Sequence, residues 1–184
     1  PGASFAGFQI PCIDQHLVFA ASLSGGGVTT VDDAGLWSNA GGPLALILRE
    51  GGPVPGLGPG FSLGTLIVLD CARGRSLLRV ALVGATPQND TALLVERAGG
   101  FVMRARGGAG AAVGTVGASF APFTGVAGRA LNRRGDAAFV SNLVGALVDP
   151  SNDRGIWREE NGILALLVRK GDALEVAPGD TRTI

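Results

Sequence analysis

His16 is the candidate side chain for acid–base catalysis near neutral pH. It is the only histidine among 184 residues, so a serine or cysteine nucleophile would have to use it as its base. It lies at the edge of a predicted loop, just before an apolar run that starts at Leu17. We therefore predict no catalytic residue and no cofactor.

Cys12 and Cys71 are the only cysteines, and their spacing matches neither a zinc site nor a C-x-x-C redox motif. We interpret them as small buried hydrophobic residues, with a disulfide as the alternative. Glu159 and Glu160 are neighbouring carboxylates. Adjacent residues of a strand point to opposite faces, so the two do not converge as a catalytic pair would. We expect both in a solvated hairpin.

The metal-site candidate of this sequence consists of Asp149, Ser151 and Asp153, which alternate like the first ligands of a calcium loop. Such a loop needs a glycine at its sixth position, and Arg154 stands there. Related segments elsewhere in the chain begin with threonine, so they lack the first carboxylate. We interpret the stretch as a solvated turn and predict no metal.

Arginine recurs at one position of an internal repeat, as Arg49, Arg106 and Arg169. Three guanidinium groups at one end of a repeat array are suited to an anionic or glycan ligand. The alternative is a structural staple, in which each arginine pairs with the aspartate of its own copy. The aspartates concerned are Asp33, Asp90 and Asp153. Recurrence in every copy favours the staple.

The repeat is found by aligning the chain on Trp37, Leu94 and Trp157. Each of these anchors has an aspartate four residues before it, an arginine twelve after it and a glycine fourteen after it. A second landmark precedes each anchor by 16 to 18 residues: Phe19, Leu78 and Phe139. We expect the anchors to be buried at equivalent places, and likewise the landmarks. The repeats span approximately 1–60, 61–117 and 118–184 of one domain.

Each repeat contains four short apolar runs bounded by Gly, Pro, Asn and Asp, which is typical of β-strands. The predicted strands are 4–10, 17–23, a segment around Trp37 and 44–49, then 62–69, 76–83, a segment around Leu94 and 101–106, then 119–126, 137–143, a segment around Trp157 and 163–169. No segment shows the sustained 3.6-residue period of a helix. Asx and Gly before an anchor predict a turn with a positive-φ glycine.

Composition excludes several classes of partner. The formal net charge is zero, so no basic surface for nucleic acid is predicted. No apolar run approaches the ~20 residues of a membrane-spanning helix, so we predict no membrane insertion. With 46% apolar and 16% charged residues, the chain is globular.

The segment 132–139 reads NRRGDAAF, and Asn132, Gly135, Ala138 and Phe139 fit the pattern NxxGxxAF. The chain thereby resembles the bacterial NxxGxxAF tandem-repeat family, which is often found on surface proteins with a variable anchor. The third copy is the most similar. The resemblance implies propeller-like β-blades and export to the bacterial cell surface. It implies no established activity.

We therefore predict an all-β chain of three tandem four-stranded repeats that resemble β-propeller blades. Three blades do not close a ring, so we expect a partial ring or fragment, completed by more repeats or by a second copy. A β-trefoil-like fold is the alternative.

The predicted function is a non-enzymatic structural or interaction module of an exported bacterial protein, with an unknown protein or glycan as partner. Its candidate binding residues are the three repeat arginines together with Arg158 and Asn161 of a loop. The alternative is the scaffold part of a propeller enzyme that acts on glycans or esters, with its active residues in blades outside this chain.

Overall fold

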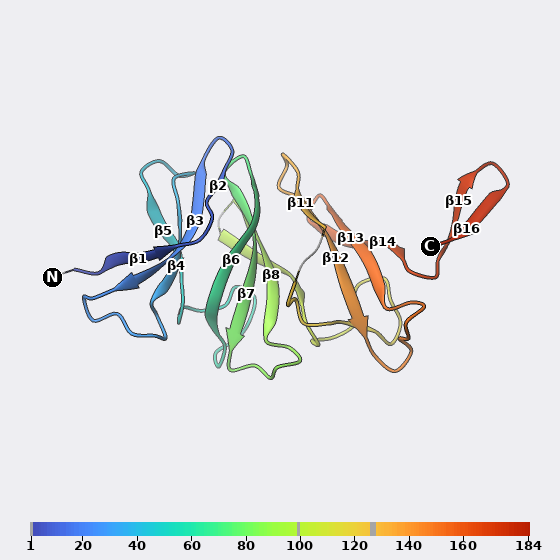
Figure 1. The fold of residues 1–184 in the computed structure, drawn as a ribbon, viewed down its shortest axis with the longest axis horizontal. Helices are drawn as coiled ribbons and strands as arrows, with labels where there is room; N and C mark the ends of the chain where they lie inside the picture. The colour runs from blue at the N-terminus through green and yellow to red at the C-terminus, as the bar shows by residue number, and fades with distance from the viewer. Residues whose placement is uncertain (1, 99, 126–127) are drawn as a thin grey trace.

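The computed structural model describes residues 2–98, 100–125 and 128–184, and within these it is all-β, as predicted. The strands form four separate antiparallel sheets, which follow one another in a row along the chain (Figure 1). The described residues form no closed ring of sheets.

Sheets 1 and 3 have five strands each, and sheet 2 has four. Sheet 1 contains β1 (Ser4–Phe8), β2 (Cys12–Ile13), β3 (Leu17–Ser24), β4 (Ala34–Ser38) and β5 (Ala45–Arg49). Sheet 2 contains β6 (Ser62–Ala72), β7 (Arg75–Val83), β8 (Thr91–Arg97) and β9 (Gly100–Arg106). Sheet 3 contains β10 (Ser119–Phe120), β11 (Arg129–Leu131), β12 (Ala137–Val144), β13 (Arg154–Glu160) and β14 (Ile163–Arg169).

The strand register confirms the alignment of the three copies. Phe19 lies opposite Trp37 in sheet 1, Leu78 opposite Leu94 in sheet 2, and Phe139 opposite Trp157 in sheet 3. All six side chains are buried. Anchors and landmarks therefore occupy equivalent core positions, as the sequence predicted.

A β-bulge recurs directly before each anchor, between Leu36 and Trp37, Leu93 and Leu94, and Ile156 and Trp157. The extra residue of each bulge lies in the partner strand, as Ile47, Arg104 or Leu167. The anchor strand therefore alternates normally, and the anchor and the residue before it point to opposite faces of their sheet. We call the face that carries Trp37, Leu94 or Trp157 the anchor face, and the other the aliphatic face. Both faces are apolar, so each sheet can be covered on both sides.

The sheets pack with the aliphatic face of one against the anchor face of the next. Val18, Ala20 and Leu36 of sheet 1 share a buried cluster with Leu78 and Leu94 of sheet 2. A second cluster joins the aliphatic face of sheet 2 to the anchor face of sheet 3, through Leu93, Ala105, Phe120, Phe139 and Trp157. The core of the chain thus lies between sheets and is built twice by the same rule.

The backbone passes from one sheet to the next by a recurring hydrogen bond. The N–H of Gly51 donates to the carbonyl of Leu63, and that of Gly108 donates to Phe120. Both glycines have positive φ, which explains why glycine ends this strand in every copy. The same bond joins Gly171 to Ile184, after the hairpin of β15 (Ala173–Ala177) and β16 (Asp180–Thr183). That hairpin was not predicted.

The glycine two residues before each tryptophan has a different role from the one we predicted. Gly35 and Gly155 are not among the positive-φ residues. A Cβ on Gly35 would lie 2.7 Å from the Trp37 ring, and a Cβ on Gly155 would lie 2.8 Å from the Trp157 ring. In the second copy the anchor is a leucine, and Ala92 is tolerated. These glycines therefore make room for an indole rather than shape a turn.

The first strand of the third repeat also differs from the prediction of 119–126. Only Ser119–Phe120 forms a strand there, and β11 supplies the rest of the pairing with β12. Residue 126 lies outside the described residues. The predicted strand is interrupted by Pro122, which has no N–H to donate to a ladder.

Trp157→Ala is expected to lower the free energy of unfolding by ~3–5 kcal/mol, because it truncates a fully buried ring in the cluster between sheets 2 and 3. Denaturant titration followed by circular dichroism would measure the change. Val116→Ala is the matched control, because Val116 is an exposed loop side chain. If the Trp157 variant were as stable as the control, the assignment of this anchor to the core would be wrong.

Candidate functional site

The repeat arginines are structural staples, but each binds one residue earlier than we predicted. The Nε of Arg49 donates to the carbonyl of Asp32, that of Arg106 to Asn89 and that of Arg169 to Asn152. Arg49 also forms an ion pair with the Asp32 carboxylate at 2.8 Å. The aspartates predicted as partners instead place their carbonyls in the sheet, where each accepts the N–H of Leu23, Leu82 or Leu143.

Asp32, Asn89 and Asn152 each hold a turn as well as an arginine. Their side chains accept the N–H of the residue three positions earlier, which is Thr29, Thr86 or Asp149. An Asx side chain at this position is therefore the repeated feature. In Asp32 the N–H and the hydroxyl of Thr29, with a smaller contribution from Arg49, lower the pKa of the carboxyl.

The metal-site candidate is a closed turn. One carboxylate oxygen of Asp149 accepts the hydroxyl of Ser151 at 2.5 Å and its N–H at 2.7 Å, and these bonds lower the pKa of Asp149. Asp153 forms a partly exposed ion pair with Lys170. Among the described residues, no group of three or more His, Cys, Asp or Glu is placed to hold a metal ion.

The two loop candidates for ligand binding lie at the β13–β14 hairpin. Arg158 forms an exposed ion pair with Glu160 at 2.9 Å. Asn161 and Gly162 form the turn, both with positive φ, as expected of an Asn-Gly hairpin. Asn161 is thus explained by the geometry of the turn, and Arg158 remains the more available of the two side chains.

The segment NRRGDAAF forms a tight turn that sheet 2 holds in place. The Oδ1 of Asn132 accepts the N–H groups of Arg134 and Asp136 across this turn. Gly135 has positive φ, and a Cβ there would collide with Arg75 and Arg97 of sheet 2. Arg75 and Arg97 donate to the carbonyls of Arg134 and Gly135.

Glu159 is the centre of a buried ionic cluster, which corrects our expectation of a solvated hairpin. Its carboxylate is fully buried and lies 2.5 Å from Arg97 and 2.7 Å from Arg104. These two contacts are ion pairs rather than aligned hydrogen bonds. The carboxylate also accepts the N–H of Ala137 at 3.2 Å. Both arginines belong to sheet 2, so the cluster fastens sheet 2 to sheet 3.

A polar side chain recurs two residues after every anchor, as Asn39, Glu96 and Glu159, and sequence reasoning missed it. Each accepts a hydrogen bond at the start of the strand that carries the landmark. Asn39 accepts the N–H of Leu17, Glu96 the hydroxyl of Ser76, and Glu159 the N–H of Ala137. The constant offset from the anchors was the available signal.

Two further carboxyls are perturbed by burial. Desolvation raises the pKa of Glu96, against the hydrogen bonds from Ser76 and the nearby charge of Arg75. Desolvation also raises the pKa of Glu50, assisted by its hydrogen bond with Asp33. Neither carboxyl has a close partner comparable to the two arginines around Glu159.

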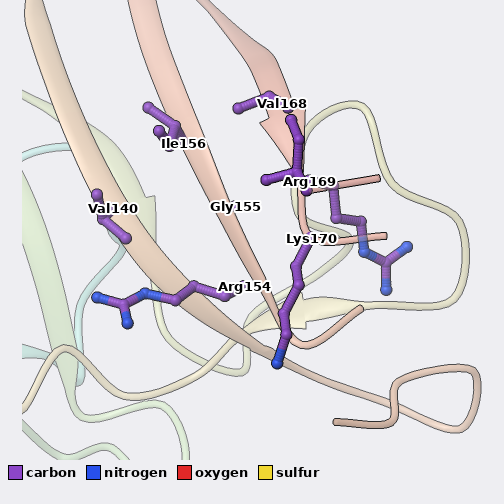
Figure 2. Close-up of a pocket in the computed structure, with 8 residues that line it drawn as sticks. Val140, Arg154, Gly155, Ile156, Val168, Arg169 and Lys170 are labelled. Carbon is purple, nitrogen blue, oxygen red and sulfur yellow. The ribbon is translucent and has the colours of Figure 1, made fainter. Parts of the chain in front are cut away.

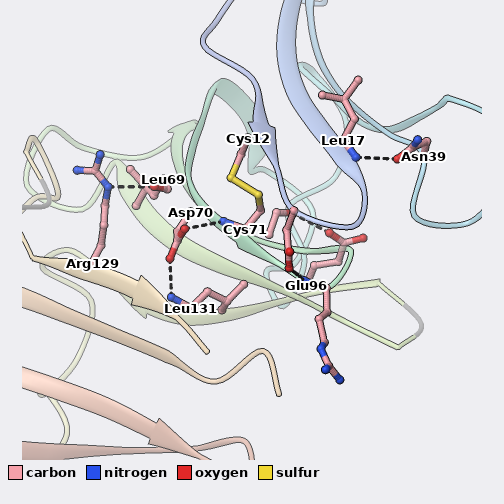
Figure 3. Close-up of a disulfide and its surroundings, with 12 residues drawn as sticks. Cys12, Leu17, Asn39, Leu69, Asp70, Cys71, Glu96, Arg129 and Leu131 are labelled. Carbon is pink, nitrogen blue, oxygen red and sulfur yellow. Dashed lines mark hydrogen bonds between the residues drawn. A yellow bond between two sulfur atoms is a disulfide. The ribbon is translucent and has the colours of Figure 1, made fainter. Parts of the chain in front are cut away.

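Cys12 and Cys71 form a disulfide, so our interpretation of them as separate buried thiols was wrong. It joins β2 of sheet 1 to β6 of sheet 2, with a Cα separation of 6.0 Å (Figure 3). The Asp14 carboxylate accepts the N–H of Arg73 beside it, and the Asp70 carboxylate accepts the N–H of Leu131. Consecutive sheets are therefore linked through β2, β6 and β11, which each pair with the landmark strand of their own sheet.

The remaining candidates for nucleophilic chemistry do not meet. His16 lies in a bend with its ring against Gly74, where an added Cβ would lie 2.7 Å from the imidazole. The segment 60–64 reads GFSLG, which fits G-x-S-x-G and which sequence reasoning missed. Ser62 is the first residue of β6 and pairs with Val83 of the neighbouring antiparallel strand. A nucleophilic serine of this motif lies instead at a sharp turn between a strand and a helix.

The open side of sheet 3 contains a pocket of about 330 Å³, lined by Val140, Ile156, Val168, Ile184 and the stems of three basic residues (Figure 2). Arg154, Arg169 and Lys170 complete its lining. It corresponds to the aliphatic face that sheets 1 and 2 bury against their neighbours.

These features define a tandem β-repeat protein whose polar side chains mostly fasten turns and neighbouring sheets. The chain belongs to a family of unknown function, DUF7453, whose model matches residues 2–75 and 79–184. No curated protein and no solved structure matches it. In the described part of the chain, no helix has the length and apolarity needed to cross a membrane.

Glu159→Gln is expected to destabilise the chain by about 3 kcal/mol, because it leaves Arg97 and Arg104 without their buried counter-charge. Glu96→Gln is the matched control at the equivalent position. Removal of that desolvated charge should be neutral or stabilising at pH 7. The pKa of Glu96 is raised in the folded chain, so the parent carboxylate becomes protonated as the pH falls through that pKa. The difference in unfolding free energy between the parent chain and Glu96→Gln should therefore shrink over that pH range. Equal losses in both variants, measured by urea unfolding, would refute the ionic role of Glu159.

Replacing Cys12 and Cys71 together by serine is expected to cost ~4 kcal/mol, from the chain entropy that a 59-residue separation releases. Urea unfolding of the parent chain with and without dithiothreitol should reproduce this loss. The double variant should not respond to the reductant. A parent chain indifferent to dithiothreitol, with its thiols shown to be reduced, would contradict the prediction.

Proposed function

We propose that this chain is a non-enzymatic structural and interaction module of an exported bacterial surface protein. The observation that carries the proposal is the use of its charged side chains. The arginines of all three copies, and the buried Glu159, are engaged in turns and between sheets. Side chains that make the same hydrogen bonds in every copy stabilise the fold and do not form a single reaction centre.

The repeats act in this proposal as propeller-like blades. Support comes from the shared register, the repeated bulge and the packing of one sheet face on the next. The NxxGxxAF resemblance fits the same reading, since Asn132 and Gly135 shape a turn and Phe139 is buried beside Trp157. Three of the four matched positions thus have structural roles.

Export is supported by the disulfide between sheets 1 and 2. Disulfides persist in oxidising compartments and are rare in a reducing cytosol. Cys12 and Cys71 are one repeat apart, so the bond fixes two neighbouring sheets rather than closing a short local loop. A module that is exposed to shear or proteases at a cell surface gains from such a link.

Ligands of the module, a protein or a glycan, would bind at loops where the copies differ. Loops on a rigid repeat scaffold tolerate variation without loss of the core. Arg158 is the strongest candidate in the hairpin 158–163, because it is exposed and its partner Glu160 is exposed as well. Surface ion pairs of this type contribute little to stability, so the arginine is free to exchange partners.

We expect the protein to be accessible to an added protease on intact cells of its own bacterium, and its cysteines to react with an alkylating reagent only after reduction. A cytosolic protein with the same tag controls for lysis. Retention in the cytosol with two free thiols would overturn the assignment to the surface. Purified protein that turned over a glycosidic or ester substrate would overturn the non-enzymatic assignment, provided that Trp157→Ala abolished the activity by unfolding.

A further inference from the structure

Sheet 1 and sheet 3 carry the same cluster of four aromatic rings on their anchor faces. In sheet 3, Phe120 meets Trp157 edge-on at 4.8 Å and Phe139 stacks on Trp157 at 6.0 Å. In sheet 1, Phe5 meets Trp37 edge-on at 4.9 Å and Phe19 stacks on Trp37 at 5.9 Å. The fourth ring is Phe123 in sheet 3 and Phe8 in sheet 1.

The two clusters differ in what covers them. In sheet 3, sheet 2 covers the rings, and Phe120 and Phe123 are only 5% and 3% exposed. In sheet 1 the equivalent Phe5 and Phe8 are 43% and 67% exposed. Aromatic rings already arranged as in a buried interface form a large apolar surface, and such surfaces mark interaction sites.

The complementary surface lies at the other end of the chain. Sheet 1 buries Leu36 against sheet 2, and sheet 2 buries Leu93 against sheet 3. Ile156 is the equivalent residue of sheet 3 and is 38% exposed. It lines the pocket with Val140 and Val168, which lie where Ala20 and Leu48 lie in sheet 1 (Figure 2).

Sheet 3 also carries a polar side chain that is positioned to form hydrogen bonds with a sheet packed on its aliphatic face. In sheet 2, Thr91 accepts the N–H of Phe123, and Arg79 donates to the carbonyls of Phe123 and Thr124. Both contacts reach the chain segment that carries the fourth ring. Arg154 takes the position of Thr91 in sheet 3 and lines the pocket. It can donate to the equivalent carbonyls at Phe8 and Gln9 of an incoming sheet 1.

We propose that the aromatic cluster of sheet 1 docks on the aliphatic face of sheet 3 of a second copy of this chain. The contact repeats, between molecules, the packing that joins sheets 1 and 2 and sheets 2 and 3 within one molecule. It is head-to-tail, so each copy offers one surface of each kind. Such an interface closes into a ring when the rotation allows and otherwise propagates.

Ile184 occupies one place that the incoming sheet needs. It exchanges hydrogen bonds with Gly171 and Asp172, as Leu63 does with Gly51 and Gly52. Phe5 is the residue of sheet 1 equivalent to Leu63, because each lies opposite a leucine of the landmark strand. Docking of a second copy therefore exchanges Ile184 for the Phe5 of that copy.

The test uses two single substitutions, Phe8→Asp in sheet 1 and Ile156→Asp in sheet 3. Each buries a charge in the proposed contact and should weaken self-association ~10-fold or more. Both residues are partly exposed, so each variant should keep the fold, as checked by circular dichroism and thermal midpoint. Val116→Asp, at an exposed loop position, is the control and should associate like the parent chain.

Analytical ultracentrifugation at high micromolar concentration should find the parent chain associated and each variant monomeric. An equimolar mixture of the two variants should form a one-to-one dimer, because each retains the surface that the other has lost. Deletion of Ile184 should strengthen association of the parent chain. A monomeric parent chain, or two variants that do not rescue each other, would overturn the proposal. Neither result bears on export or on the absence of catalysis.

Discussion

Sheets 1, 2 and 3 are each apolar on both faces, and this constraint determines the rest of the structure. The normal alternation of each anchor strand makes two successive large residues, such as Leu36 and Trp37, point to opposite sides of the sheet, and both are buried. A single sheet of this kind leaves a great deal of apolar surface in water. The repeats therefore depend on their neighbours, as in other repeat architectures where each unit contacts only the next.

Polar interactions are arranged around that apolar packing. The arginine staple holds the turn that precedes each anchor, and the side chain two residues after the anchor fixes the start of the adjoining strand. Only one of these sites, at Glu159, became a charged cluster between sheets. There the second sheet supplies Arg97 and Arg104, whereas Glu96 has a serine as its partner and a raised pKa. The same position thus serves either as a local hydrogen-bond acceptor or as a fastener between sheets.

Much of the fold could be predicted because the repeat places the same residue types at fixed offsets. Burial of Trp37, Leu94 and Trp157 followed from that alignment, as did the recurrence of glycine after each third strand, where the structure has positive φ. Long-range partners could not be predicted in this way. The arginine staple was displaced by one residue because the backbone carbonyl, not the carboxylate, is the common acceptor. Glu159 and the disulfide were missed because their partners lie in another sheet, beyond the reach of any local pattern.

The covalent link between sheets 1 and 2 also determines how the chain would respond to a pulling force. Cys12 and Cys71 are 59 residues apart, so β3, β4, β5 and most of β6 lie inside the closed loop. Tension applied to the two ends would pass from residue 12 to residue 71 through the disulfide and would bypass those strands. The loop withholds ~200 Å of contour length at ~3.5 Å per extended residue. Strands β7, β8 and β9 of sheet 2 and all of sheet 3 lie outside this loop, so among the described residues they would be the parts that extend.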